Sequence, residues 1–116
     1  MPTSVEMYDE AIELQQGGKL EEAVGKLHEL LEQDPAYGLA HSALSVFYQK
    51  LDRNDEAIEH GRRVCELEPQ DPFSFVALSM ICQKANRISE AEQAQMQARQ
   101  AQAAFEQASP EQDAPK

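Results

Sequence analysis

Residues 22–35 read EAVGKLHELLEQDP and residues 56–69 read EAIEHGRRVCELEP, so one pattern occurs twice at an interval of 34 residues. Both stretches begin with Glu-Ala and end with an acidic residue followed by proline. A third Glu-Ala pair, Glu90-Ala91, follows at the same interval. A fixed interval of this length is typical of repeat proteins, in which every unit adopts the same local structure.

Two further sets of residues recur in phase with this pattern. Small residues occupy one position of every unit, namely Ala11, Ser45 and Ser79. Apolar residues occupy another, namely Leu14, Tyr48 and Cys82. Small side chains allow neighbouring helices to approach closely, and large ones fill the space around the contact. Three units, at about residues 4–37, 38–71 and 72–105, therefore cover nearly the whole chain.

Each unit reads as two helices joined by a short turn. Thr3 followed by Glu6 is the pattern of a capping box, and Gly17-Gly18 is a helix end. A helix stops before a proline such as Pro35, because the preceding residue avoids helical angles. The first four helices are predicted over residues 4–17, 20–33, 38–51 and 55–67. No stretch alternates with period two, so we expect no strands.

The third unit carries its own helix signals. Asp71 is the expected N-cap and Pro72 the first helical residue of its first helix. Its second helix is expected to begin after Ser89. The unit lacks the closing proline, so this helix is predicted to extend to about Ala108. Residues 109–116, which are polar and contain two prolines, are predicted to be disordered.

The pattern resembles the tetratricopeptide repeat (TPR), which has a unit of 34 residues. The resemblance covers residues 4–105 and rests on Leu44, Ser45, Tyr48, Ala57 and Pro69 in the second unit and on Phe75, Leu78, Ser79, Cys82, Ala91 and Ala98 in the third. In the first unit it rests on Met7, Ala11, Leu14, Ala23, Leu27 and Pro35. It implies an all-α, right-handed TPR solenoid of three helix-turn-helix repeats, a single domain over residues 1–108 with an extended C-terminal helix. Gly61 stands where the pattern has a bulky residue, so we expect weaker packing there.

Composition excludes several classes of function. The formal net charge of -11 repels phosphate backbones and anionic membrane surfaces, so we expect neither nucleic-acid nor membrane binding. The N-terminal sequence has no basic or apolar segment of a signal peptide, and a cytoplasmic location is expected. No catalytic motif is present, so we expect no enzyme activity, no catalytic residue and no cofactor.

The resemblance also implies where a partner binds. TPR proteins bind peptides or helices on a concave surface lined by the first helix of each repeat. The corresponding residues here are Val5, Tyr8, Asp9 and Ile12, then Leu39, Ser42, Ala43 and Val46, then Phe73, Val76, Ala77 and Met80. This floor is strongly apolar. We expect it to bind a hydrophobic or amphipathic peptide or helix of a protein partner, or alternatively a second copy of the chain as a homodimer.

One family-specific mode of binding is not expected. Chaperone-binding TPR proteins hold a C-terminal carboxylate with a clamp of Lys, Asn and Arg side chains. The clamp positions here hold Tyr8, Ile12, Ala43, Phe73 and Ala77, none of which is cationic. The sequence therefore predicts that no carboxylate clamp forms.

Basic residues recur at the turns between paired helices. They are Lys19, Lys50, Arg53, Lys84 and Arg87. They form a basic rim that would suit acidic residues of a partner. Alternatively, they only stabilise the C-termini of helices, which is worth about 0.3–1 kcal/mol each.

The histidines and cysteines give no clear site. His28, His41 and His60 occupy three different repeat positions, so we expect no ladder of metal ligands. His60 is expected on the surface and His41 partly buried. Cys65 and Cys82 lie at inward positions and are interpreted as small buried apolar groups, and a disulfide between them stays open. Two cysteines outside a CxxC pair do not make a structural zinc site.

Overall fold

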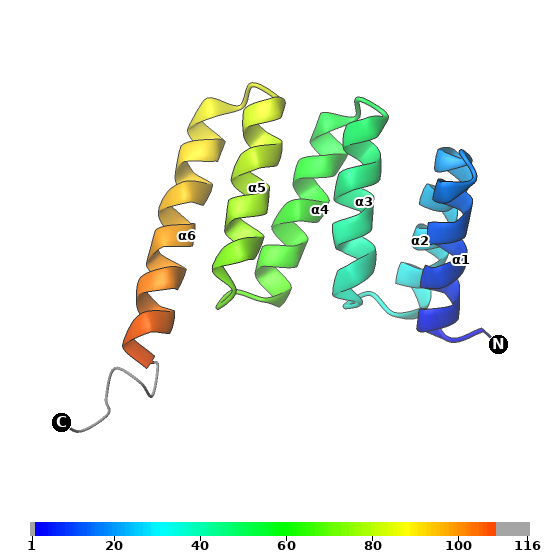
Figure 1. The fold of residues 1–116 in the computed structure, drawn as a ribbon, viewed down its shortest axis with the longest axis horizontal. Coiled ribbons are helices and arrows are strands. Elements are labelled where there is room, and N and C mark those ends of the chain that lie inside the picture. The colour runs from blue at the N-terminus through cyan, green and yellow to red at the C-terminus, as the bar shows by residue number, and fades with distance from the viewer. Residues whose placement is uncertain (1, 109–116) are drawn as a thin grey trace.

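The computed structural model describes residues 2–108 and contains only helices in that range. They are α1 (Ser4–Gln16), α2 (Leu20–Gln33), α3 (Gly38–Lys50), α4 (Asn54–Leu67), α5 (Pro72–Lys84) and α6 (Ile88–Ala108). Figure 1 shows them side by side as three hairpins, α1 with α2, α3 with α4 and α5 with α6. The first hairpin and α6 lie at opposite ends of the molecule, which measures 54 × 36 × 22 Å. The all-α solenoid is therefore confirmed, whereas the predicted disordered tail, 109–116, lies outside the described residues.

The predicted helix starts are confirmed in the first and fifth helices. The Thr3 hydroxyl accepts a hydrogen bond from the Glu6 amide at 3.1 Å, and the Glu6 carboxylate accepts one from the Thr3 amide at 2.8 Å. The Asp71 carboxylate accepts a hydrogen bond from the Phe73 amide at 3.0 Å, and Pro72 is the first residue of α5. These caps bind backbone N–H groups that have no partner within the helix.

The turn inside each hairpin has the same backbone conformation. Its central residue has a positive φ, which is 81° at Gly18, 60° at Asp52 and 61° at Asn86. The amide of the following residue donates a hydrogen bond to a carbonyl five residues back, from Lys19 to Leu14, Arg53 to Tyr48 and Arg87 to Cys82, each at 2.8 Å. Glycine, aspartate and asparagine are the residues that tolerate this left-handed conformation best. The interval of 34 residues is therefore also an interval of turn chemistry.

This turn explains why the prediction that α6 starts after Ser89 is wrong. The Ala91 amide already bonds the Arg87 carbonyl at 2.9 Å, as Ala57 bonds Arg53 at 3.1 Å in the preceding hairpin. The turn geometry places the first helical hydrogen bond there without a side-chain cap. Ser89 therefore lies in the first turn of α6, which begins at Ile88.

Small residues at the helix contacts are buried as the ladders predict. Ala11, Ala23 and Ala57 have no exposed surface. Gly61 has a similar role, because a Cβ there would lie 3.2 Å from the δ-methyl groups of both Leu78 and Ile81. The absence of a side chain at Gly61 thus lets α5 approach α4 closely.

The two cysteines are free thiols in the buried core, as the sequence predicts. Burial, reinforced by the negative charges of Asp71 and Glu66, raises the pKa of Cys65 to about 11. Burial also raises the pKa of Cys82. Both sulfurs are therefore protonated at neutral pH and are poor nucleophiles.

Candidate partner-binding site

The first helices of the second and third hairpins form a groove between them. One pocket of about 200 Å³ is lined by Ser42 from α3 and by Phe73 and Ala77 from α5. A second pocket of about 480 Å³ lies closer to the turns and is lined by Val46 from α3 and by lysines at the ends of both helices. We call this surface the α3–α5 groove; it comprises Leu39, Ser42, Val46 and Lys50 on α3 and Phe73, Val76, Ala77, Met80 and Lys84 on α5.

Large apolar side chains on this groove are exposed. The exposed fractions are 77% for Phe73, 54% for Met80, 56% for Leu39, 45% for Val46 and 42% for Val76. On each helix these residues are three or four positions apart and so share one face. A contiguous apolar patch on neighbouring helices is typical of an interaction surface.

The first hairpin contributes less to this surface than the sequence suggests. Val5 is 58% exposed, but Tyr8 and Ile12 are half-buried and pack against the core. The ring of Tyr8 lies 6.1 Å from that of Tyr37, in the connection between α2 and α3. Ala43, which was expected on the floor, is buried at 9% exposed because its methyl group belongs to the core cluster. The exposed floor is therefore formed mainly by α3 and α5.

The predicted basic rim divides into two kinds of residue. Arg53 pairs with Glu56 at 2.7 Å, and Arg87 pairs with Asp55 at 2.6 Å and also with Glu90. Hydrogen bonds to Glu90 and then to Asp55 hold the pKa of Arg87 above its usual range. The two arginines are therefore engaged by carboxylates of the chain itself.

The lysines of the rim have no such partner. Lys50 and Lys84 are the last residues of α3 and α5, both are exposed, and neither forms an ion pair with any residue in the range 2–108. Both line the upper pocket of the groove together with one carboxylate, Asp52. Lys19 is exposed in the first hairpin, away from this pocket. The position of the two lysines fits both interpretations of the rim, a partner contact and a helix C-terminus.

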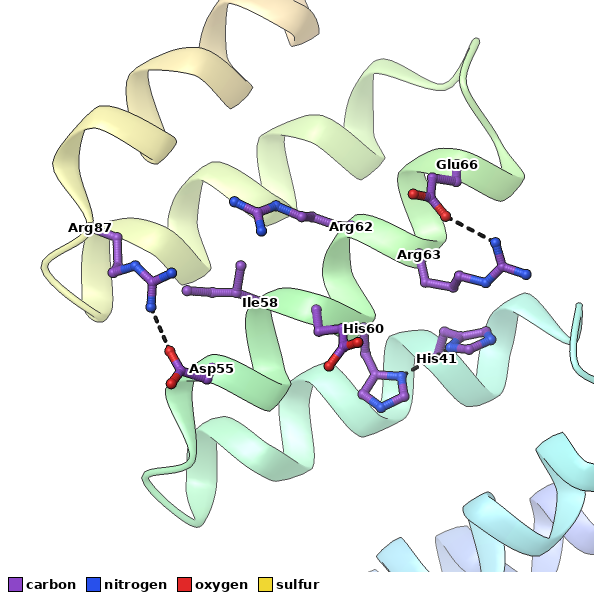
Figure 2. A pocket seen from close by; sticks show the side chains of 9 residues that line it. His41, Asp55, Ile58, His60, Arg62, Arg63, Glu66 and Arg87 are labelled. Atoms are coloured by element: carbon purple, nitrogen blue, oxygen red, sulfur yellow. Dashed lines mark hydrogen bonds and ion pairs between the residues drawn. The ribbon is translucent and has the colours of Figure 1, made fainter.

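A second, polar pocket lies along α4, as Figure 2 shows. Its volume is about 750 Å³, and its cationic side chains are Arg62, Arg63 and Arg87. Each arginine is turned towards a carboxylate: Arg63 bonds Glu66 at 2.9 Å, Arg87 bonds Asp55, and Arg62 bonds Glu90. The positive charge of this pocket is thus balanced internally, which argues against an anion site.

The described range contains no candidate for metal binding or membrane insertion. Among residues 2–108, no three His, Cys, Asp or Glu side chains are grouped as metal ligands would be. None of the helices in the same range has the length and apolar character that crossing a membrane requires.

A cluster of ring side chains between the first two hairpins was not predicted from the sequence. His41 is buried at 7% exposed and His60 is half-buried, so the expectation of a surface position for His60 is wrong. The Nδ1 atoms of these two rings lie 3.0 Å apart, and Nε2 of His28 lies 2.7 Å from the Tyr48 hydroxyl. Equal repeat positions do not reveal this cluster. The available signal was that the second helix of one unit packs on the first helix of the next, where unequal positions meet.

Comparison with known proteins identifies the fold. No family model and no curated protein sequence matches the chain. Among solved structures, MamA is similar with a TM-score of 0.82 and 14% identity over 91% of this chain and 58% of that chain. The second TPR of Spaghetti (RPAP3), bound to the HSP90 peptide SRMEEVD, has a TM-score of 0.72 and 18% identity over 83% and 89% of the two chains. The Yersinia enterocolitica type III secretion translocator chaperone SycD has a TM-score of 0.73 and 20% identity over 90% and 81%.

Proposed function

Because the chain has the tetratricopeptide-repeat fold, we propose that it is a non-catalytic protein-interaction module, an adapter or chaperone-like protein. It binds a hydrophobic or amphipathic peptide or helix in the α3–α5 groove. The observation that carries this proposal is the row of exposed large apolar side chains on two adjacent helices. The similar RPAP3 domain is bound to an HSP90 peptide and SycD is a translocator chaperone, which supports a function of this class.

The apolar area of the groove is large enough for moderate affinity. Burying a Leu- or Phe-sized side chain completely is worth about 1.5–3 kcal/mol. Phe73, Met80 and Val46 are each about half exposed or more, so a partner removes much of their surface from water. After the loss of translational and rotational freedom, three or four such contacts support a dissociation constant of about 1 μM.

The polar end of the groove suggests the chemistry of the partner. Lys50 and Lys84 line its upper pocket, and neither forms an ion pair within residues 2–108. An amphipathic segment with apolar residues over Phe73 and Met80 therefore gains from a carboxylate side chain near these lysines. The partner contributes internal acidic side chains to this contact, because the clamp positions for a terminal carboxylate are apolar here.

Peptide display tests the proposal with a matched control. A library of about 20-residue peptides is selected against the wild-type chain, against Val46→Glu and against Met96→Glu. Val46 and Met96 are exposed to similar extents, 45% and 56%, but Met96 lies on α6, outside the groove. We expect wild type and Met96→Glu to enrich the same peptides with apolar residues three or four apart, and Val46→Glu to lose them. Equal enrichment by all three chains would contradict a groove site.

Self-association is the second candidate, favoured by the continuation of the apolar surface beyond the groove. Phe73 also borders a pocket of about 760 Å³ with Phe105 of α6, which is 63% exposed. A homodimer would cover this surface, although the net charge of -11 on each copy opposes it. Light scattering after size-exclusion chromatography, at two loadings about a hundredfold apart, distinguishes a constant 13.0 kDa species from one of twice that mass that dissociates on dilution.

A further inference from the structure

Four ring side chains meet where the first hairpin packs against the second. The cluster comprises His28 from α2, His41 and Tyr48 from α3, and His60 from α4; we call it the His–Tyr cluster. The ring of His60 lies 5.2 Å from that of His41, 5.7 Å from that of His28 and 5.8 Å from that of Tyr48, centroid to centroid. His60 is therefore the centre of the cluster.

The cluster occupies the less extensive of the two contacts between hairpins. α2 packs on α3 less extensively than α4 packs on α5. At the α4–α5 contact, Gly61 meets the side chains of Leu78 and Ile81. At the α2–α3 contact, His28 instead bonds Tyr48 at 2.7 Å. The attachment of the first hairpin thus depends in part on polar, titratable groups.

The hydrogen bonds define the protons that the neutral cluster carries. Nε2 of His41 lies 2.9 Å from the Pro35 carbonyl oxygen, which only accepts, so Nε2 carries a hydrogen. In neutral His41, Nδ1 is then an acceptor. Nδ1 of His60, at 3.0 Å, must therefore donate to it. The pair is satisfied when both imidazoles are neutral.

Added protons disturb this arrangement. One extra proton is tolerated by the hydrogen bond, because a charged His60 still donates from Nδ1 to His41. A second proton places two N–H groups face to face across the 3.0 Å contact between His41 and His60. The two positive charges then also repel each other at short range in a half-buried site.

The surroundings give a protonated cluster little compensation. No carboxylate among residues 2–108 forms an ion pair with any of the three histidines. The charged groups of α4 near His60 are Glu56, which is engaged by Arg53, and Glu59 and Arg63, which line the adjacent pocket. Arg53 itself adds a positive charge 5.0 Å from the centre of the Tyr48 ring. Burial first, then the charges of His41 and His28, lower the pKa of His60 to about 4 against the opposing effect of Glu56.

We propose that the His–Tyr cluster is a pH-sensitive latch, which holds the first hairpin on the second while the imidazoles are neutral and releases it as they are protonated. The latch acts at the α2–α3 contact, so α5 and α6 stay folded when the first hairpin detaches. The proposal concerns the fold alone and does not depend on the function of the α3–α5 groove.

The direction of the pH effect follows from the difference in proton binding between the closed and open forms. His60 binds a proton with a pKa near 6.5 when exposed and near 4 in the closed form. The open form therefore gains protons first, and the latch weakens as the pH falls from about 6.5 towards 4. Between pH 7.5 and 5.0 these two values alone give an increase in the opening constant of about 25-fold. Because His60 is about half exposed, we expect about tenfold.

Hydrogen exchange read by mass spectrometry tests the latch on the whole chain. Protection factors, corrected for the intrinsic pH dependence of exchange, are compared at pH 7.5 and 5.0. We expect those of α1 and α2 to fall about tenfold at pH 5.0 and those of α5 and α6 to change less than twofold. An equal fall in all helices, or no fall in α1 and α2, would overturn the proposal.

A double variant provides the control. In the pair His41→Gln with His60→Asn, the amide groups replace the ring nitrogens without titrating. We expect its α1 and α2 protection to be the same at both pH values, and a retained tenfold response would refute the role of these histidines. If this variant does not fold, an NMR titration of the wild-type histidines decides: a His60 that titrates near 6.5 with the first hairpin still attached also overturns the latch.

Discussion

Phe73 and Phe75 are two residues apart on α5, yet the structure assigns them opposite roles. Phe73 is 77% exposed on the α3–α5 groove, whereas Phe75 is 9% exposed in the core. Phe73→Ala removes only the buried quarter of a side chain whose full burial is worth about 1.5–3 kcal/mol, so we expect a loss of about 0.5 kcal/mol. Phe75→Ala deletes a packed core ring, for which a loss of about 3–5 kcal/mol is expected.

Thermal unfolding followed by circular dichroism measures both variants. For a chain of this size, 1 kcal/mol corresponds to about 3–5 °C in Tm. We therefore expect Phe73→Ala to unfold within about 3 °C of the wild type and Phe75→Ala at least about 10 °C lower. Phe73→Ala should in addition weaken a display-selected peptide by about 5- to 30-fold, since the complex covers most of the ring. If Phe73→Ala lowers Tm as much as Phe75→Ala does, Phe73 belongs to the core and the groove assignment is refuted.

Three further predictions concern the fold. Gly25→Ala should raise the free energy of unfolding in urea by about 0.5–1 kcal/mol, because no other side chain lies near the added methyl group, whereas Gly61→Leu should lower it by about 1–3 kcal/mol through its clash with α5; equal signs would contradict the close α4–α5 contact. Asp71→Ala should lower it by about 1 kcal/mol and Asp71→Ser should restore most of the loss, and no loss would show that the cap is not formed. Cys65 and Cys82 should react with Ellman's reagent slowly at pH 8 and rapidly in urea, because burial raises the pKa of both thiols; fast reaction of the folded chain would contradict their burial.

Features set by the repeat interval could be predicted from the sequence. The ladders placed Ala23 and Ala57 at buried helix contacts, and the same interval predicted two helices in each unit. The left-handed turn residues Gly18, Asp52 and Asn86 follow the same interval. These features depend on local backbone geometry and on contacts that every unit repeats, which is why one sequence reveals them.

Features that depend on contacts between unequal positions could not be predicted in this way. Helical spacing puts Ala43 and Ala77 at corresponding places, yet Ala43 is buried and Ala77 is exposed, because the neighbouring hairpins differ. The histidines come together only when α2 packs on α3. The start of α6 was misplaced because Ser89 offers a good capping side chain that the turn does not use.

Methyl NMR of the chain with one display-selected peptide tests the central proposal most directly. Val46, Val76 and Met80 report on the α3–α5 groove, and Ile88 and Met96 are exposed apolar residues of α6 outside it. We predict that the peptide shifts or broadens the first three methyl signals and leaves the last two unchanged. Shifts centred on Ile88 and Met96, with the groove methyls unaffected, would contradict a groove site.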